Sequence, residues 1–294
     1  MSAVAPTAST ASTASAPSPP DQGGSSLTVA AQMLGADFLK LRRKRGIMIW
    51  ALVLAVAPIL IFFLVSAIQH ASEPLKYGPH GLEGYGPAGG VKNFSDGLRV
   101  VTLFFGPLAA ILIGVEAGTG DASAGVFRDL VVTGRSRLAL FASRVPAALA
   151  VCWIVIIAAY VLLLAGSLVF ASNLPTPGGA LILNGLGFAL LGTGVLCVIA
   201  VGLASLTTSK PAAIIVMIAW QVVASPLIAS ISSLGSSRRA ILSQAIAHFS
   251  PVHVGEGGHG ASVTMSEGTA LLVVVVWVAV FLALGAWRTR TMDS

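Results

Sequence analysis

Charged residues gather in one short segment of a chain that is otherwise strongly apolar. Only 10% of its 294 residues are charged, whereas 55% are hydrophobic. Residues 116–144 nevertheless hold seven charged side chains, which are Glu116, Asp121, Arg128, Asp129, Arg135, Arg137 and Arg144. Charges are costly in the hydrocarbon of a bilayer. We therefore expect this segment to lie in water or against another protein, where a partner can contact it.

The middle of this segment has the pattern of a short amphipathic helix, over about residues 123–133. Its apolar stripe comprises Val126, Phe127, Leu130 and Val131, and Arg128 and Asp129 lie on the charged flanks. Asp121 or Ser123 can cap the start of this helix, Gly134 can end it, and Ser136 can cap the next helix. An exposed apolar stripe with a charged rim suits docking into a groove of a partner. The alternative is a loop helix that packs on lipid or on its own chain.

No motif of known catalytic or nucleotide-binding chemistry accompanies this segment. A Walker motif needs a lysine and then Ser or Thr after its last glycine, whereas Gly125 is followed by Val126. The H-E-x-x-H and G-x-S-x-G patterns are also missing. Three histidines near Glu256 match no standard zinc spacing: His248, His253 and His259. We expect no catalytic residue, cofactor or metal site here, so that any ATP would be hydrolysed by another polypeptide.

The elements that position the charged segment are predicted to be membrane-spanning helices. The mean hydropathy of the chain is +0.89, which is too high for a soluble domain. About twenty apolar residues cross the hydrocarbon core as a helix, because every backbone polar group must be satisfied within the segment. Six stretches meet this condition, at about 47–69, 98–116, 146–170, 180–206, 212–232 and 269–287. The expected fold class is all-α, a polytopic membrane protein with six transmembrane helices.

The basic residues predict how these six helices are oriented. An even number of spans puts both termini on one side, and twelve of the seventeen Lys and Arg residues then lie on that side. These twelve are Lys40, Arg42, Arg43, Lys44, Arg45, Arg128, Arg135, Arg137, Arg144, Lys210, Arg288 and Arg290. The positive-inside rule therefore places both termini in the cytoplasm. The net charge of +6 is explained by this bias, since basic residues at the inner surface face anionic lipid. No nucleic-acid partner is needed to explain it.

The N-terminal region divides into a tail and a basic helix. Residues 1–28 are rich in Ala, Ser, Thr and Pro, so we expect a disordered cytoplasmic tail without a secretory signal. The pattern of residues 29–45 predicts an interfacial amphipathic helix. Its apolar side comprises Leu34, Phe38 and Leu41, and its basic side comprises Lys40 and Arg43. Such a helix would lie along the inner membrane surface. The alternative is a basic topology signal with no further role.

Residues within and between the spans give little support for ion-coupled chemistry. Glu116 lies at the end of a span rather than at mid-bilayer, where a proton relay would need it. Cys152 and Cys197 are expected to be small packing residues, and the glycines of the fourth span are expected to let helices approach closely. Residues 70–96 are expected to be irregular, and residues 240–249 are expected to form a short outer helix or a shallow re-entrant piece.

Taken together, the chain resembles the permease subunit of an ABC-2 type ABC transporter, of an actinobacterial kind, over about residues 29–290. The resemblance rests on the basic lead-in ADFLKLRRKRG, on a run in the inner loop, and on a helix-like piece that ends at Ser250-Pro251. The inner-loop run comprises Glu116, Gly118-Thr119, Phe127-Arg128-Asp129-Leu130 and Gly134-Arg135-Ser136-Arg137. Six spans with one charged inner loop between the second and third strengthen it. The long tail and the insertion-like run DASAG before Val126 depart from the family pattern.

The resemblance implies a cytoplasmic coupling helix that docks into a separate ATP-binding subunit. The contact would be made by Val126, Phe127, Arg128, Leu130 and Val131. Glu116 and Arg137 would brace it. Two such permeases, identical or related, would pair in the bacterial plasma membrane around a substrate path. The implied activity is export of a drug, antibiotic, lipid or polysaccharide. The alternative is a stand-alone membrane protein, either a secondary transporter or an assembly factor, without ATP coupling.

Overall fold

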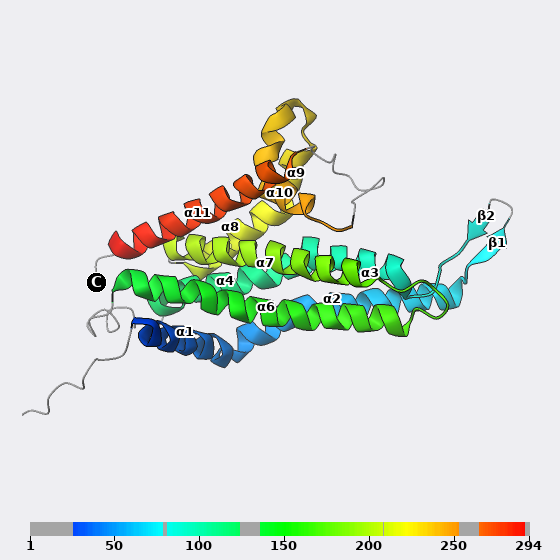
Figure 1. Ribbon diagram of the computed structural model, residues 1–294, viewed down its shortest axis with the longest axis horizontal. Helices are drawn as coiled ribbons and strands as arrows, with labels where there is room; N and C mark the ends of the chain where they lie inside the picture. Colours follow the sequence, from blue (N-terminus) through cyan, green and yellow to red (C-terminus); the bar gives the residue numbers. More distant parts are fainter. Residues whose placement is uncertain (1–25, 79–80, 124–135, 208, 253–264, 292–294) are drawn as a thin grey trace, which may run out of the picture.

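The computed structural model describes residues 26–78, 81–123, 136–207, 209–252 and 265–291, and over these it confirms an all-α polytopic membrane protein. Six helical segments are long and apolar enough to cross a membrane (Figure 1). They are Arg45–Ser72, Gly90–Gly120, Arg137–Val169, Gly179–Thr207, Lys210–Ser230 and Glu267–Thr291. Each overlaps one of the six predicted stretches, because length and hydropathy largely decide whether a helix can span.

Shorter elements surround and subdivide these spans. In chain order the elements are α1 (Ser26–Arg43), α2 (Arg45–Ser72), β1 (Lys76–Gly78), β2 (Gly81–Glu83), α3 (Gly90–Arg99), η1 (Val100–Phe105), α4 (Gly106–Ser123), α6 (Arg137–Val169), α7 (Gly179–Thr207), α8 (Lys210–Ile218), η2 (Ala219–Ala224), α9 (Ser225–Ser230), η3 (Ser232–Ala240), α10 (Leu242–His248) and α11 (Glu267–Thr291). The second span is thus α3, η1 and α4 in series, and the fifth is α8, η2 and α9.

The second and third spans begin earlier than hydropathy predicts. The second starts at Gly90, because α3 is amphipathic and buries Phe94 and Leu98 on one face. The third starts directly after Ser136, whose hydroxyl accepts a backbone N–H from the first turn of α6 at 3.1 Å. This hydrogen bond confirms the predicted cap. Pro146 lies inside α6 without ending it.

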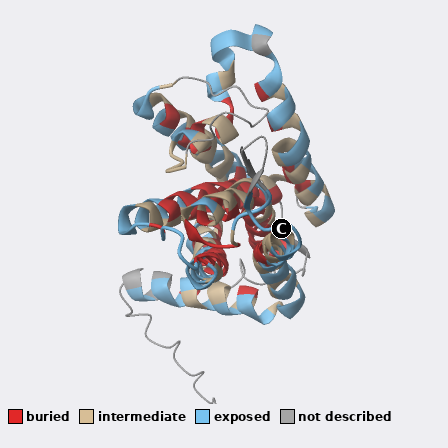
Figure 2. Cartoon of the chain, turned by 90° about the vertical axis from the view of Figure 1, so that its right-hand side faces the viewer, coloured by how far each residue is buried: buried red, intermediate tan, exposed pale blue. Residues whose placement is uncertain are grey.

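Three helices form the centre of the bundle and three form its exterior. In their most apolar windows, α7 is 72% buried, the second span 56% and α6 50%, whereas α2, the fifth span and α11 are each 22% buried. Figure 2 looks along the bundle and shows the buried residues gathered in the central helices. Exposed apolar side chains on the outer helices, such as Leu60, Leu227 and Leu272, suit contact with lipid chains.

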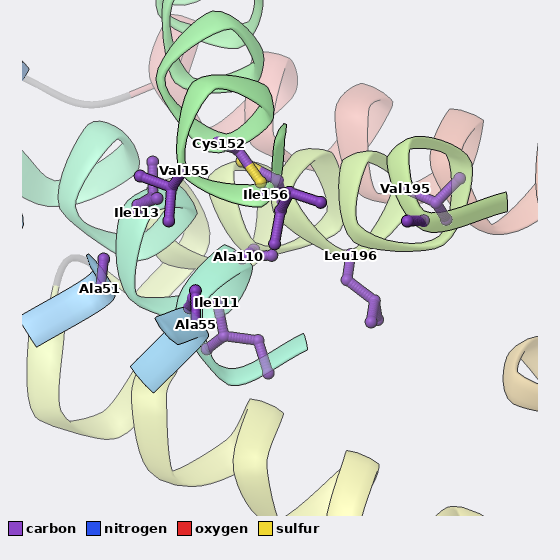
Figure 3. Packing of buried hydrophobic residues seen from close by; sticks show 14 of the residues in the cluster. Ala51, Ala55, Ala110, Ile111, Ile113, Cys152, Val155, Ile156, Val195 and Leu196 are labelled. Carbon is purple, nitrogen blue, oxygen red and sulfur yellow. The ribbon is translucent and has the colours of Figure 1, made fainter. Parts of the chain in front are cut away.

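Glycines allow the central helices to touch almost backbone to backbone. A Cβ at Gly114 of α4 would lie 2.4 Å from the Cys197 carbonyl oxygen of α7, and one at Gly118 would lie 2.6 Å from that of Val201. Such close approach favours dispersion contacts, which hold helices together in lipid. Small side chains fill the same layer, including the fully buried Cys152 (Figure 3). Both cysteines are free thiols in this core, as expected of packing residues.

The second and fifth spans each contain one π-helical turn, placed just before a proline. Proline cannot donate a backbone hydrogen bond, and its ring clashes with the carbonyl four residues earlier. The helix widens there, so the residue before the proline bonds five residues back instead of four. The donors and acceptors are Gly106 to Val101 before Pro107, and Ser225 to Trp220 before Pro226.

The loops at the end of the bundle opposite α1 contain more structure than the sequence indicates. The expectation that residues 70–96 are irregular is wrong in part. Antiparallel β1 and β2 pair Lys76 with Glu83, and α3 already begins at Gly90. A helix at 240–249 is confirmed as α10, and Trp277 of α11 donates a hydrogen bond to the Ala240 carbonyl just before it, at 2.9 Å.

Candidate functional site at the basic end of the bundle

Helix ends from across the chain meet at one end of the bundle, here called the basic end. It contains α1, the start of α2, the end of α4, the start of α6, the start of α8 and the end of α11. The described chain therefore begins and finishes at the same end (Figure 1). This is what an even number of spans requires. The segment 124–135 joins α4 to α6 and lies outside the described residues.

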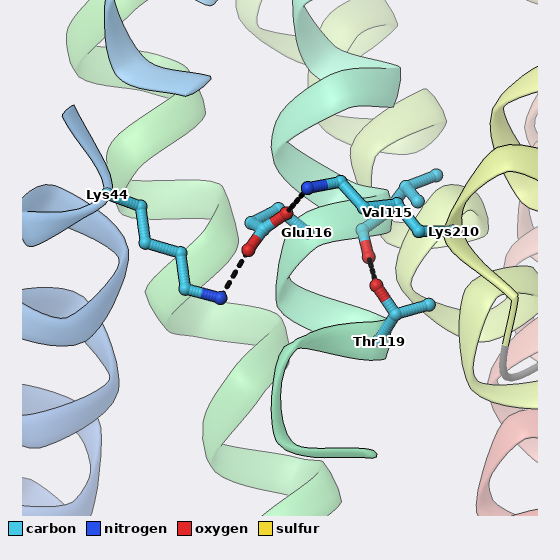
Figure 4. Close-up of polar contacts among 5 residues, drawn as sticks. All are labelled: Lys44, Val115, Glu116, Thr119 and Lys210. Atoms are coloured by element: carbon cyan, nitrogen blue, oxygen red, sulfur yellow. Dashed lines mark hydrogen bonds and ion pairs between the residues drawn. The ribbon is translucent and has the colours of Figure 1, made fainter. Parts of the chain in front are cut away.

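Glu116 of α4 forms the centre of this end. Its side chain is only 4% exposed, and each of its carboxylate oxygens pairs with a different lysine (Figure 4). The Lys44 ammonium contacts Oε1, and the Lys210 ammonium contacts Oε2. A buried carboxylate without a counter-charge would be strongly destabilising, and two neighbouring cations offset part of that cost. We call these three residues the Glu116 triad.

The triad joins three helices at points where their backbones change course. Lys44 occupies the break between α1 and α2, where its φ of −78° and ψ of 69° are not helical. Lys210 is the first residue of α8 and is followed by Pro211, a residue favoured in a first helical turn. Glu116 lies two turns before α4 ends at Ser123. The triad thus links the first, second and fifth spans at the basic end of the bundle.

A second polar group lies beside the triad and ties α1 to α6. The Ser143 hydroxyl of α6 donates a hydrogen bond to the Asp37 carboxylate of α1 at 2.6 Å. Arg144, only 5% exposed, directs Nη1 toward the Gly118 carbonyl of α4 at 3.5 Å. The first contact ties α1 to α6, and the second ties α6 to α4.

A small cavity of about 20 Å³ lies between the two groups. Its lining consists of Asp37, Lys40, Leu41, Lys44, Glu116, Ala117, Gly120 and Arg144, and we call it the Glu116 cavity. Burial lowers the pKa of the Lys40 ammonium below its ordinary value of 10.5, and the positive charges of Arg144 and Lys44 lower it further, against the opposing effect of Asp37. Basic and acidic side chains thus meet around this cavity.

Of the residues predicted to contact or brace a partner, the structure describes only Glu116 and Arg137. Val126, Phe127, Arg128, Leu130 and Val131 lie outside the described residues. Of the two residues predicted to brace the contact, Glu116 lies in the triad and Arg137 directs Nη1 toward the Arg290 carbonyl at the end of α11, 3.4 Å away. α4 continues through Asp121 to Ser123, and the helix that Asp121 or Ser123 was predicted to cap lies outside the described residues.

The predicted amphipathic helix is confirmed as α1, and its apolar side packs mainly on protein. Leu41 is 8% exposed and Phe38 packs against the core, whereas Leu34 is exposed. α1 packs mainly on α6. Lys40 faces the Glu116 cavity, and Arg43 remains in contact with the surroundings.

Sequence reasoning missed the partners of Glu116. Lys44 was counted only as part of the basic cluster before the first span, and Lys210 only as one of the twelve basic residues. A signal for Lys210 was present, because a lone basic residue directly before Pro211 marks a helix start at the membrane boundary. The Asp37–Ser143 contact joins residues 106 positions apart, and no local pattern reveals it.

Among the described residues, no group of three or more His, Cys, Asp or Glu side chains could hold a metal ion. What the site offers instead is a network of charges that connects helix ends. No protein-family model and no curated protein sequence matches this chain.

Proposed function

We propose that this chain is the membrane-spanning permease subunit of an ATP-driven exporter of the ABC-2 type. In this proposal ATP is hydrolysed on a separate subunit, and the chain itself is not an enzyme. The cargo would be a drug, antibiotic, lipid or polysaccharide. A second copy of the chain, or a related permease, would complete the substrate path.

The observation that carries the proposal is the position of the Glu116 triad. Glu116 lies two turns before the end of α4, which leads directly into segment 124–135. The same carboxylate is bonded to the start of α2 through Lys44 and to the start of α8 through Lys210. A force on the segment would reach three spans together. Rigid coupling of this kind is what a partner-driven transition between two states requires.

The orientation that this function needs follows from charge. The basic end contains Lys40, Lys44, Arg144 and Lys210, together with the last turn of α11 and its two arginines. The positive-inside rule would place this end, and both termini, in the cytoplasm of a bacterial cell. An ATP-binding subunit would then meet the segment 124–135 from the cytoplasmic side of the plasma membrane.

The proposal is tested by disrupting the predicted docking stripe. Phe127→Asp combined with Leu130→Asp should abolish co-purification with an ATP-binding subunit encoded beside this chain, while insertion into the membrane stays normal. Two carboxylates in an apolar contact surface oppose its burial. A matched control is Leu234→Asp, an exposed apolar residue of η3 outside the basic end.

Normal co-purification and transport by the double variant would refute the docking assignment. Equal loss in the Leu234 control would show that the effect comes from general damage to the fold. Crosslinkers placed along residues 124–135 give an independent readout. Capture of an ATP-binding subunit supports the proposal, and labelling only by reagents confined to the outside of the cell contradicts it.

A further inference from the structure

The spans of this bundle differ in reach, because α11 stops short of the end opposite the basic end, here called the far end. The helices α7 and α11 run in the same direction and cross at Gly202, where a Cβ would overlap the backbone of Phe281. From this crossing α7 extends for 23 residues back to Gly179, whereas α11 extends for only 14 back to Glu267. At a rise of 1.5 Å per residue, α11 therefore begins about 14 Å below the far end of α7.

The end of the fifth span and the connection that follows it also lie beside the middle of α7. A Cβ at Gly192 would lie 3.2 Å from Ile246 of α10, and Gly192 is 13 residues from the start of α7 and 15 from its end. Trp277, whose ring stacks on Phe281 near the crossing, donates its hydrogen bond to the carbonyl of Ala240 at the end of η3. Figure 1 likewise shows α9 and α10 level with the middle of the bundle, well short of α3. We call the surface formed by α9, η3, α10 and the start of α11 the notch.

Polar contacts within the notch hold its segments together. Arg238 of η3 donates one hydrogen bond to the Ala229 carbonyl of α9 and one to the Gly235 carbonyl, each at 3.3 Å. The hydroxyls of Ser225 in α9 and Ser243 in α10 lie 2.5 Å apart. The depth of the notch is thus fixed by bonded helices.

The notch exposes groups that hydrocarbon cannot accommodate. Ser236, Ser237 and Arg239 of η3 are exposed, and so is Glu267 at the start of α11. The backbone of η3 is also irregular, since Gly235 has a φ of 50° and a ψ of −125°. Exposed irregular backbone and charged side chains are not stable among lipid chains. This surface therefore needs contact with water or with lipid head groups.

The longer helices expose apolar side chains closer to the far end than the notch. Leu183 of α7 is exposed and lies nine residues beyond Gly192, or about 14 Å along the helix. Val161 of α6 is exposed at the same level, because the neighbouring Tyr160 hydroxyl donates to the Ile182 carbonyl at 2.6 Å. Apolar side chains of this kind suit contact with lipid chains. The hydrocarbon should therefore extend farther on this side of the molecule than beside the notch.

We propose that the bilayer is thinned beside the fifth and sixth spans, so that lipid head groups and water descend to the notch while lipid chains cover the longer helices toward the far end. Spans that are shorter than the surrounding hydrocarbon are accommodated by such local thinning. A polar molecule that crosses the membrane beside the notch then meets a thinner hydrocarbon layer. This deformation goes beyond the proposed transport function and does not rest on it.

The test measures how fast single cysteines react with a charged, membrane-impermeant thiosulfonate. The full-length chain is reconstituted in liposomes that are permeabilised, so that the reagent reaches both membrane surfaces. Ser236→Cys reports on the notch, Leu183→Cys on the apolar level of α7, and Glu73→Cys on an exposed site after α2. The wild-type chain gives the background, because both of its thiols are fully buried.

We expect Ser236→Cys to react within about tenfold of the rate of Glu73→Cys, and Leu183→Cys to react at least about fiftyfold more slowly, because hydrocarbon excludes both the thiolate and the charged reagent. The proposal is overturned if Ser236→Cys is as slow as Leu183→Cys, since η3 would then be covered. It is also overturned if Leu183→Cys is as fast as Glu73→Cys, since the far end would then stand in water. Should Ser236→Cys fail to fold, Ser237→Cys, which is also exposed in η3, replaces it.

A second reagent distinguishes a thinned bilayer from a water-filled pocket. A phospholipid that carries a maleimide on its head group should label Ser236→Cys and leave Leu183→Cys unlabelled. If the soluble thiosulfonate reacts with Ser236→Cys but the lipid reagent does not, the notch holds water without lipid, and the thinning is refuted.

Discussion

Replacing Glu116 with glutamine removes the negative charge of the triad, to which both lysines bind. The resulting loss of stability can be estimated from the structure. The change keeps the size of the side chain but leaves the ammonium groups of Lys44 and Lys210 close together without an anion between them. Removing one partner of a fully buried pair costs about 3–5 kcal/mol. Here the lysine side chains remain 33% and 39% exposed and can turn toward water, so we expect about 2–3 kcal/mol.

Thermal unfolding in detergent, followed by size-exclusion chromatography, measures this loss. For a chain of this size a loss of 2–3 kcal/mol lowers the melting temperature by about 4–12 °C. The control is Glu73→Gln, which removes the same charge from an exposed position after α2. Adding Lys210→Gln to the Glu116 variant should restore part of the stability, since neighbouring charges are not additive.

A Glu116→Gln chain that melts within about 1 °C of the Glu73 control would refute the reasoning. The triad would then be an incidental contact of exposed lysines, and the observation that carries the proposed function would fail with it. A loss of stability that Lys210→Gln deepens instead of relieving would show that the two lysines do not repel each other.

The remaining predictions concern a cap, a helix contact and a titration. Ser136→Ala should lower the stability by about 1 kcal/mol in the same melting assay, because it removes the hydrogen bond to the first turn of α6. Gly114→Ala should lower it by about 1–3 kcal/mol, since the new Cβ would lie 2.4 Å from the Cys197 carbonyl. Its control, Gly187→Ala, has open space and should be neutral or slightly stabilising. Lys40→Met should stabilise the lipid-free chain near pH 7, and the gain should shrink as the pH rises from the lowered pKa of the folded state toward 10.5. The sign follows because a folded-state pKa below the unfolded value makes wild-type stability increase with pH, and a gain that is constant with pH would contradict it.

The sequence predicted the parts of this fold that local pattern controls. Six spans follow from hydropathy, and the cap at Ser136 and the helix α10 follow from short-range hydrogen-bonding preferences. Hydropathy averaging placed the start of the second span too late, because α3 mixes the buried Phe94 with the polar Lys92 and Asn93. The pairs of Glu116 could not be predicted, since they depend on which span ends come together and not on neighbouring residues.

The π turn in the second span changes how its residues should be counted. In a regular α-helix one extra residue would rotate everything beyond it by about 100°. Buried positions up to the start of the π turn are Phe94, Leu98 and Val101. The face that continues them without a slip holds Phe105, Leu108 and Leu112, which are only partly buried; adding one residue reaches the buried Gly106, Ala109 and Ile113. The π turn absorbs the extra residue, so both halves of this span keep their buried face toward the interior. A chain that lacks the extra residue together with Pro107 should therefore form a regular α-helix here with the same interior.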